Sequence, residues 1–474
     1  MTRTSHDLEV TAHLELQGQA IPIEIADALS YCLLISFHGR PAAAGGPGFD
    51  GLRLRCGDNE ILLGPCRFEP HVDIPRRRRD DAPLGPGDGR LLFLEQIYDF
   101  STLFRTGAVI DVRHKVEQLP LLWGRKGEIR RSFRDYTSSL VYDMQVYRAL
   151  FDAIDRSMEG ELPQVRDLIH HVAVTAEYPG FQRFYDQMVR ELEQEVREFS
   201  RQEHEQHGFY FRKQLWDIIL ASPFLARTNI KPRGYSGDSV GMQMIYERGW
   251  RGPTIFSKFM HRYPIETAAA QAVRNRLELV IDRVRVARAD RKDGERLRVM
   301  SVACGPSREL RDLLREPADA ARYQFTLLDQ DQTALTESRQ EIQRFEREHD
   351  ARVEISFVQE SVRTMLRTPR LSARFGTFHF LYSMGLFDYL TRPVAEAVLS
   401  KLYELLVPGG EILLGNFHVG NPTRVYMDYW ADWTLFYRTE EEFTALARSL
   451  PGARCEISFE ETRSQMFLQI RKVA

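Results

Sequence analysis

The chain is 474 residues long, which exceeds the usual size of one compact core and predicts two or three domains. Hydrophobic residues make up 43% and charged residues 28% of it, a composition that excludes a fibrous or wholly disordered protein. The formal net charge of −3 gives no overall attraction to phosphate backbones or anionic membranes, and so disfavours nucleic acid as a partner.

The N-terminus carries early charges without the apolar segment of a signal peptide, and no run of 18 apolar residues follows anywhere. The five cysteines are odd in number and form no CxxC pair, which argues against a disulfide framework and against a zinc ribbon. We therefore expect a cytoplasmic protein with reduced thiols, no bound metal and no stable insertion into a membrane.

Residues 1–117 are predicted to form a small β-rich domain. Short apolar alternations, such as the one from Leu52 to Arg55, are separated by turn-rich stretches. One of these stretches, 75–89, is expected to be a surface loop and contains four consecutive arginines, 76–79. The arginines could bind an anionic ligand, but a solvated run of charge is the more ordinary interpretation.

Residues 118–265 are predicted to form a helical region that includes a segment capping the substrate. Apolar residues recur there at intervals of three and four, as at Phe181 and Phe184. His204 and His207 do not have the HExxH spacing that places two imidazoles on one helix face, so we expect a polar helix face rather than a metal site.

The stretch from Lys231 to Asp238 is dense in turn formers and polar side chains. Such a loop could close over an active site, or it could be an ordinary connection rich in Pro and Gly. In the first interpretation, Arg233 would orient a substrate carboxylate and Tyr235 would contact the substrate.

The most informative part of the chain starts near residue 297, where a predicted strand, tight turn and helix start follow one another. Small residues at Ala303, Gly305 and Ser307 let backbone amides approach a ligand closely. Asp329 ends the second predicted strand, where a carboxylate can accept hydrogen bonds from both ribose hydroxyls. Together these positions predict a nucleoside site.

Two further strand ends follow. Ser361 and Val362 come after a third predicted strand, 353–358, at the place from which a loop would hold an adenine ring. A fourth predicted strand, 376–382, leads directly into Ser383. The alternation of strands and helices predicts an α/β domain with a parallel sheet.

In this ordering, residues 266–474 resemble the class I S-adenosylmethionine-dependent methyltransferases. The turn at 299–307 is similar to the family's first glycine motif, Asp329 to its ribose carboxylate, and 406–414 to the L-x-P-G-G turn before its fifth strand. The resemblance implies a Rossmann-like, seven-stranded domain, a methyltransferase activity and S-adenosyl-L-methionine as the cofactor.

The first motif departs from the family pattern, which usually has an acidic residue and three glycines where this chain has Ser301, Ala303, Gly305 and Ser307. Arg308 and Glu309, just beyond the turn, could contact the ammonium and carboxylate of the cofactor. They could equally be a charged surface pair at the start of a helix.

Several residues after the fifth predicted strand are candidates for catalysis and substrate binding, because pockets in this fold lie at the carboxyl ends of the strands. His418 could remove a proton from the nucleophile, or Arg438 and Arg233 could orient a substrate carboxylate. The aromatic residues that follow suit either a pocket lining or a helix packed into the core. The substrate-binding candidates are Tyr235, Tyr426, Tyr429, Trp430 and Trp433.

A narrower resemblance rests on residues 231–238, 382–390 and 416–438, which are similar to bacterial methyltransferases that make 3-hydroxy fatty acid methyl esters, such as that of 3-hydroxypalmitic acid. It implies O-methylation of a lipid-like carboxylate. Residues 25–32 are similar to a degenerate PilZ domain, in which the upstream arginine pair and the glycine are missing. That resemblance implies a scaffolding domain rather than one that binds cyclic di-GMP.

Two classes of function remain open at this stage. The first is an enzyme that methylates a small molecule, either a lipid-like acid or another metabolite accepting the methyl group on nitrogen or oxygen. The second is a signalling protein whose methyltransferase-like domain senses a ligand without turnover.

Overall fold

The computed structural model describes residues 10–28, 32–37, 48–56, 59–70, 88–93 and 127–473, except 293 and 369. The chain divides into two compact units, each made of separate segments. The N-terminal unit consists of Met1–Ser236, Trp250–His261 and Tyr429–Asp432, and the C-terminal unit of Gly237–Gly249, Arg262–Asp428 and Trp433–Ala474.

The N-terminal unit contains a seven-stranded sheet in which every described strand pair is antiparallel. The strand order is β5-β4-β1-β2-β3-β7-β6. Leu52 and Leu54 are buried while Arg53 and Arg55 between them are not, which explains the alternation seen in the sequence. The strands are β1 (Val10–Leu16), β2 (Gln19–Ala28), β3 (Cys32–Phe37), β4 (Gly51–Cys56), β5 (Asn59–Leu63), β6 (Cys66–Pro70) and β7 (Asp88–Phe93).

Two stretches singled out in the sequence cannot be placed in this sheet. The arginine run 76–79 lies outside the described residues, and so do residues 29–31 of the PilZ-like stretch.

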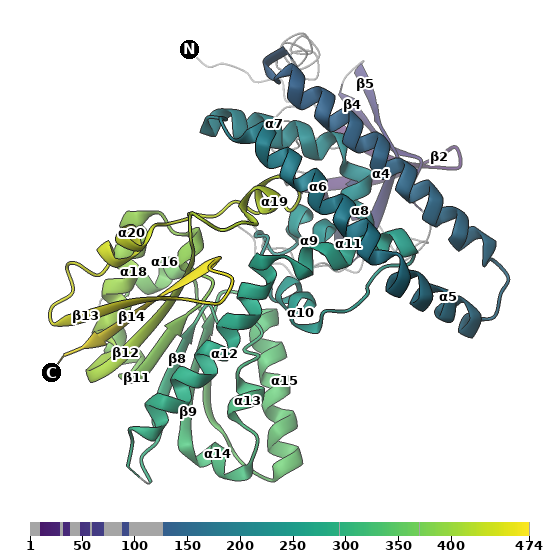
Figure 1. Cartoon of the computed structure of the whole chain (residues 1–474). Helices are drawn as coiled ribbons and strands as arrows, with labels where there is room; N and C mark the ends of the chain where they lie inside the picture. The colour runs from purple at the N-terminus through teal and green to yellow at the C-terminus, as the bar shows by residue number, and fades with distance from the viewer. Residues whose placement is uncertain are drawn as a thin grey trace, which may run out of the picture. The chain divides into compact units, whose positions relative to one another are not determined.

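The N-terminal unit has helices where the sequence shows helical spacing (Figure 1), and aromatic side chains pack between them, as Phe151 and Phe181 do against Phe259. His207 is fully buried, and its Nε2 accepts the backbone N–H of Arg130 at 3.0 Å, so it is a structural residue. Among the described residues, no group of acidic, His and Cys side chains could hold a metal ion. The helices are α4 (Arg131–Ser157), α5 (Pro163–Ala176), α6 (Tyr178–Val196), α7 (Arg201–Gln214), α8 (Trp216–Ala221), α9 (Pro223–Ile230) and the first part of α11 (Ile255–Glu266).

The C-terminal unit is built on a seven-stranded sheet of order β10-β9-β8-β11-β12-β14-β13. The first five strands are parallel and β14 is antiparallel to both of its neighbours. The carboxyl ends of the parallel strands therefore meet at one edge. The strands are β8 (Leu297–Val302), β9 (Tyr323–Asp329), β10 (Glu354–Gln359), β11 (Phe378–Ser383), β12 (Leu406–Phe417), β13 (Ala453–Phe459) and β14 (Gln465–Lys472).

Helices cover both faces of this sheet, as Figure 1 shows. Alternate residues of one strand face opposite cores, so Val299 packs with α12, α13 and α15 while Met300 packs with α16 and α18. The predicted Rossmann-like sheet is confirmed. The helices are α12 (Ala268–Ala289), α13 (Leu310–Leu313), α14 (Pro317–Arg322), α15 (Gln332–His349), α16 (Val362–Arg367), α17 (Leu371–Phe375), η1 (Phe387–Tyr389), α18 (Arg392–Glu404), α19 (Arg424–Tyr429) and α20 (Glu440–Ala445).

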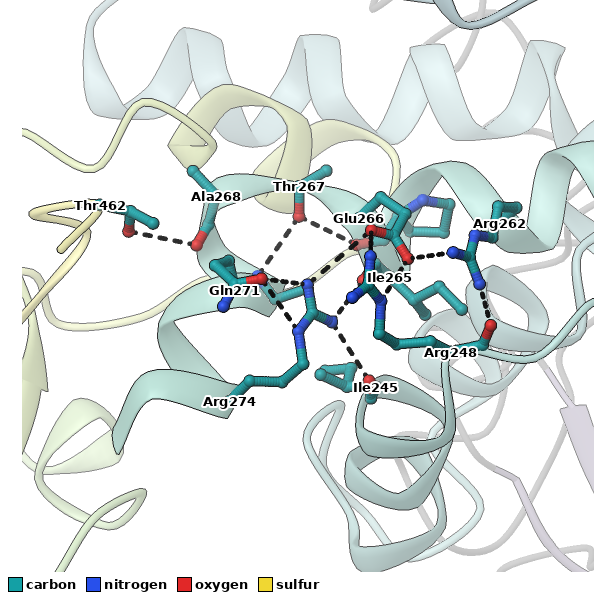
Figure 2. Close-up of polar contacts among 12 residues, drawn as sticks. Ile245, Arg248, Arg262, Ile265, Glu266, Thr267, Ala268, Gln271, Arg274 and Thr462 are labelled. Carbon is teal, nitrogen blue, oxygen red and sulfur yellow. Dashed lines mark hydrogen bonds and ion pairs between the residues drawn. The ribbon is translucent and has the colours of Figure 1, made fainter. Parts of the chain in front are cut away.

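The two units do not follow the expected division at residue 266, because α10 (Ser239–Glu247) belongs to the C-terminal unit and Tyr429–Asp432 to the N-terminal unit. Figure 2 shows how its end is held. The Glu266 carboxylate accepts a hydrogen bond from Nη2 of Arg248 at 2.7 Å and forms an ion pair with Nη2 of Arg262 at 2.8 Å. Arg274 donates through Nη1 to two backbone carbonyl groups, those of Ile245 and Ile265. These bonds join α10 to the start of α12.

In the part of the chain that the structure describes, no helix combines the length and the apolar character needed to span a bilayer.

Candidate functional site

The turn after β8 has an unusual backbone. Ala303, Gly305 and Ser307 all have φ values between 44° and 55°, a region that residues with a Cβ rarely adopt. At Gly305 a built Cβ meets no heavy atom within 4 Å, so the protein leaves open space beside the turn. The turn therefore presents its backbone at the carboxyl edge of the sheet.

Asp329, at the end of β9, lies against this turn. Its Oδ2 accepts the backbone N–H of Gly305 at 2.9 Å and its Oδ1 accepts that of Asp331 at 2.9 Å. Burial raises the pKa of Asp329, against the opposing effect of these backbone hydrogen bonds. Each carboxylate oxygen can accept a second hydrogen bond. Asp329 thus shapes the turn and keeps acceptor capacity for ligand hydroxyls.

Glu360, directly after β10, lies in the stretch predicted to hold the adenine ring, although only Ser361 and Val362 were predicted as cofactor ligands there. Its backbone N–H donates to the carbonyl of Asp329 at 3.0 Å, and one of its carboxylate oxygens pairs with Arg374. Its other oxygen, Oε2, is buried without a hydrogen-bond partner in the structure. Buried polar atoms nearly always have a partner, so this oxygen is a candidate acceptor for a ligand. An acidic residue at the end of a predicted strand was the signal that could have revealed it.

Ser361 and Val362, the two cofactor ligands predicted beside Glu360, form the start of α16. Ser361 is the N-cap of α16 and accepts the backbone N–H of Thr364 at 3.3 Å, while Val362 is the first residue of that helix. Ser383, predicted as a cofactor ligand, is fully buried and donates to the carbonyl of Val302 at 2.8 Å. Its hydroxyl joins β11 to β8.

Glu309 is buried, which rules out the interpretation of a charged surface pair. It accepts a hydrogen bond from the hydroxyl of Tyr382, and burial raises the pKa of Glu309. Arg276 of α12 is also buried and donates to the carbonyl of Met384 at 3.2 Å. Arg276 and Tyr382 could not be predicted as neighbours of Glu309, because each lies far along the chain from it.

Arg438 has a different role from the one expected. Its guanidinium donates to the carbonyls of Phe387, at 2.8 Å, and Leu390, and also to the side chain of Asn416. These bonds hold the loop after β11 against the end of β12. Arg438 therefore positions the backbone of the loop after β11, a role that the sequence did not predict.

His418 is similarly engaged. Its Nδ1 accepts the backbone N–H of Gly420 at 3.1 Å, so in the neutral ring Nε2 carries the hydrogen and donates to Glu440 at 3.1 Å. With both ring nitrogens occupied, this geometry does not support His418 as the base that deprotonates a substrate.

Asp388 follows β11 and is almost completely buried. Its Oδ1 accepts the backbone N–H of Phe417 at 2.7 Å, which ties the loop after β11 to the end of β12. Burial raises the pKa of Asp388 to about 6, against the attraction of Arg276 and Arg438. This value lies in the range in which a carboxyl group changes charge near neutral pH.

The predicted aromatic cluster separates into two sets. In the C-terminal unit, the indole N–H of Trp433 donates to the hydroxyl of Tyr389 at 2.7 Å. Gly237 lies against both rings, because a Cβ there would come within 2.8 Å of the Tyr389 hydroxyl and 2.5 Å of the Trp433 ring. Tyr426 packs against Tyr263, with ring centroids 5.4 Å apart.

Tyr429 and Trp430 are core residues of the N-terminal unit, which corrects their prediction as substrate ligands. The hydroxyl of Tyr429 lies 3.0 Å from Nδ1 of His204, and the Trp430 ring packs 4.9 Å from that of Tyr185. Both side chains are at most 1% exposed. The helical spacing of the cluster reflected burial here rather than a pocket.

Arg233 and Tyr235 also belong to the N-terminal unit. They lie in a tight turn, where the backbone N–H of Gly234 donates to the carbonyl of Lys231 at 2.8 Å. The Lys231 ammonium forms an ion pair with Asp432 in the same unit. The structure accordingly does not bring Arg233 or Tyr235 together with the Gly305 turn inside one unit.

Comparison with known proteins finds a family match within the C-terminal unit. Residues 299–410 match the sequence profile of a family described as a methyltransferase domain. The match confirms the prediction of a methyltransferase and agrees with S-adenosylmethionine as its cofactor. A search of curated proteins finds no match.

Solved structures give remote likenesses. A possible exported protein from Bordetella parapertussis is 18% identical, with 66% of this chain and 100% of that chain covered and a TM-score of 0.41. Magnesium protoporphyrin IX methyltransferase from Synechocystis PCC 6803, crystallised with S-adenosylhomocysteine, is 12% identical, with coverage of 50% and 95% and a TM-score of 0.34. The N-methyltransferase NodS from Bradyrhizobium japonicum is 14% identical, with coverage of 42% and 96% and a TM-score of 0.29.

Proposed function

We propose that the methyltransferase domain of this chain transfers a methyl group from S-adenosylmethionine to a small molecule. The observation that carries the proposal is the carboxyl edge of the parallel sheet, where three neighbouring strands end in the Gly305 turn, Asp329 and Glu360. An open turn beside two acidic side chains, one with an unpartnered oxygen, suits a polar nucleoside ligand.

The cofactor would supply a methyl group made electrophilic by an adjacent sulfonium. Asp329 would accept hydrogen bonds from the ribose hydroxyls, and Oε2 of Glu360 would accept an N–H of the base. Glu309 and Arg276, both buried near the same edge, offer an acceptor and a donor that suit the ammonium and carboxylate of the methionine end.

The residues that would contact the methyl acceptor define its chemistry less closely than the residues that would bind the cofactor. Tyr389 and Trp433 give the C-terminal unit a pair of joined aromatic rings after β11, which supports an acceptor with an apolar part. O-methylation of a 3-hydroxy fatty acid carboxylate is compatible with such a lining. Its expected anchor, Arg438, is however already bonded to backbone carbonyls, so the proposal does not rest on a carboxylate acceptor.

The experiment is a two-part test on the full chain. Calorimetry with S-adenosylmethionine and S-adenosylhomocysteine should show micromolar binding, and incubation with methyl-labelled cofactor and panels of acids, phenols and amines should release S-adenosylhomocysteine. Absence of binding would overturn the proposal. Binding without turnover on any panel would favour the alternative of a ligand-sensing protein.

A further inference from the structure

A chain of three polar side chains in the N-terminal unit is used by no part of the proposed reaction. Asp155 comes from α4, His170 from α5 and Lys258 from α11. Oδ1 of Asp155 lies 2.7 Å from Nε2 of His170, and Nδ1 of His170 is in hydrogen-bond contact with the Lys258 ammonium. The side chains of Asp155 and His170 are only 18% and 15% exposed.

The direction of these hydrogen bonds follows from the chemistry of the groups. A lysine ammonium has only donors, so Nδ1 of His170 must accept from it. The hydrogen of the neutral imidazole then sits on Nε2 and is donated to Asp155. Oδ2 of Asp155 also accepts the backbone N–H of Ile255 at 3.0 Å, which fixes the carboxylate.

The order carboxylate, imidazole, nucleophile is the arrangement that activates nucleophiles in covalent catalysis, where a base takes the proton and a third group orients the base. We propose that Lys258 is a nucleophilic amine that reacts with electrophilic carbonyl groups, with His170 as its base and Asp155 as the positioning residue.

With an acyl thioester, Lys258 is acylated and a thiol is released. Once the ammonium has lost a proton to solvent, Nζ of Lys258 attacks the carbonyl carbon, and the new C–N bond forms as the C–S bond breaks. A proton of Nζ passes to Nδ1 of His170, and Asp155 stabilises the resulting imidazolium. The departing thiolate takes up that proton and leaves as a thiol. With an aldehyde, the same attack ends in loss of water and gives an imine.

The surroundings of Lys258 favour the neutral amine that this step needs. Burial lowers the pKa of Lys258, against the attraction of Asp155 on α4 and Asp167 on α5. The ring of His170 is in hydrogen-bond contact with Nζ, where it can take up a proton.

The test is competitive labelling of the full chain at pH 7, followed by peptide mass spectrometry. One arm uses a small acetyl thioester and the other a small aldehyde trapped with cyanoborohydride, so that acyl and aldehyde chemistry are distinguished. The exposed Lys213 is the internal reference. We expect Lys258 to react about tenfold faster than Lys213 in at least one arm, although it is less exposed, because a base activates the nucleophile.

A matched pair of variants tests the base. His170→Gln keeps a hydrogen-bonding side chain but cannot take up the proton, and should bring the ratio of rates down to that of an ordinary lysine. His171→Gln changes the exposed neighbour on the same helix and should leave the ratio unchanged. Equal reactivity of Lys258 and Lys213 in both arms, or an unchanged ratio in His170→Gln, would overturn the proposal.

Discussion

The two seven-stranded sheets of this protein use the same number of strands for different purposes. In the N-terminal sheet every described pair is antiparallel, and charged side chains pair with one another across strands, as Arg53 does with Glu15 and Glu60. In the C-terminal sheet five parallel strands end at one edge and bring together Gly305, Asp329 and Glu360 from distant parts of the sequence. Strand direction, rather than strand number, makes a site.

The two sheets also treat charge differently. Arg53 is partly exposed, so its ion pairs with neighbouring strands are weak and screened by salt. Glu309, Asp329 and Asp388 are buried, and burial raises the pKa of each. A buried carboxylate destabilises the folded state when it is ionised. Proteins retain such groups mainly where function needs them, so acids with raised pKa values are concentrated at functional sites.

The largest expected effect is at Asp329. In Asp329→Ala the ribose loses two charged acceptors, each contributing roughly 1.5 to 3 kcal/mol, and the N–H groups of Gly305 and Asp331 lose their partner. We expect affinity for S-adenosylhomocysteine, measured by calorimetry, to fall by at least about 100-fold.

The matched control is Asp282→Ala, which removes an exposed aspartate from α12 in the same unit. Asp282→Ala should bind S-adenosylhomocysteine with the same affinity as the wild type. If Asp329→Ala were folded, as judged by circular dichroism, and bound normally, the nucleoside site would have to lie elsewhere and the contrast between the two sheets would fail.

The sequence predicted the C-terminal sheet and its first two strand ends because those features are local. A strand followed by small residues and then by a strand ending in Asp can be recognised within about thirty residues of chain, as the βαβ unit requires. Gly305 and Asp329 are accordingly in direct hydrogen-bond contact.

What the sequence did not predict depends on contacts between distant segments. Tyr429 and Trp430 have the spacing of a pocket lining, but they pack into the N-terminal unit, whose helices lie about 200 residues earlier, as the contact of Trp430 with Asn229 shows. Arg438 and His418 are polar residues near the strand ends, and only the structure reveals that both are hydrogen-bonded to neighbouring parts of the protein. The periodicity of apolar residues indicates that a helix face is buried, but it does not indicate which segment covers that face.

An intermediate effect is expected at Asp388. Because folding raises its pKa to about 6 from an ordinary value of 3.8, the group favours the folded state most when protonated, and that contribution is lost as the pH rises from about 4 through 6. Asp388→Asn keeps an acceptor for the N–H of Phe417 but cannot ionise. The variant should gain about 2 kcal/mol of stability relative to wild type as the pH rises from about 4.5 to about 7.5.

Urea unfolding at several pH values, followed by tryptophan fluorescence, measures this difference. Asp312→Asn, which changes a partly exposed aspartate on α13, serves as the control and should show no such trend. If the difference in stability between wild type and Asp388→Asn did not change with pH, the pKa of Asp388 would not be raised by burial.

The smallest effect is expected in the antiparallel sheet. Arg53→Ala removes the ion pairs with Glu15 and Glu60, but all three side chains are at least partly exposed and water replaces the lost contacts. We expect the thermal unfolding midpoint to shift by less than about 2 °C, with less difference still in 0.5 M salt. Affinity for S-adenosylhomocysteine should be unchanged, because the cofactor site proposed here lies wholly in the other unit. A substantial loss of affinity in Arg53→Ala would show that the antiparallel sheet takes part in ligand binding, and the functional contrast between the two sheets would then be wrong.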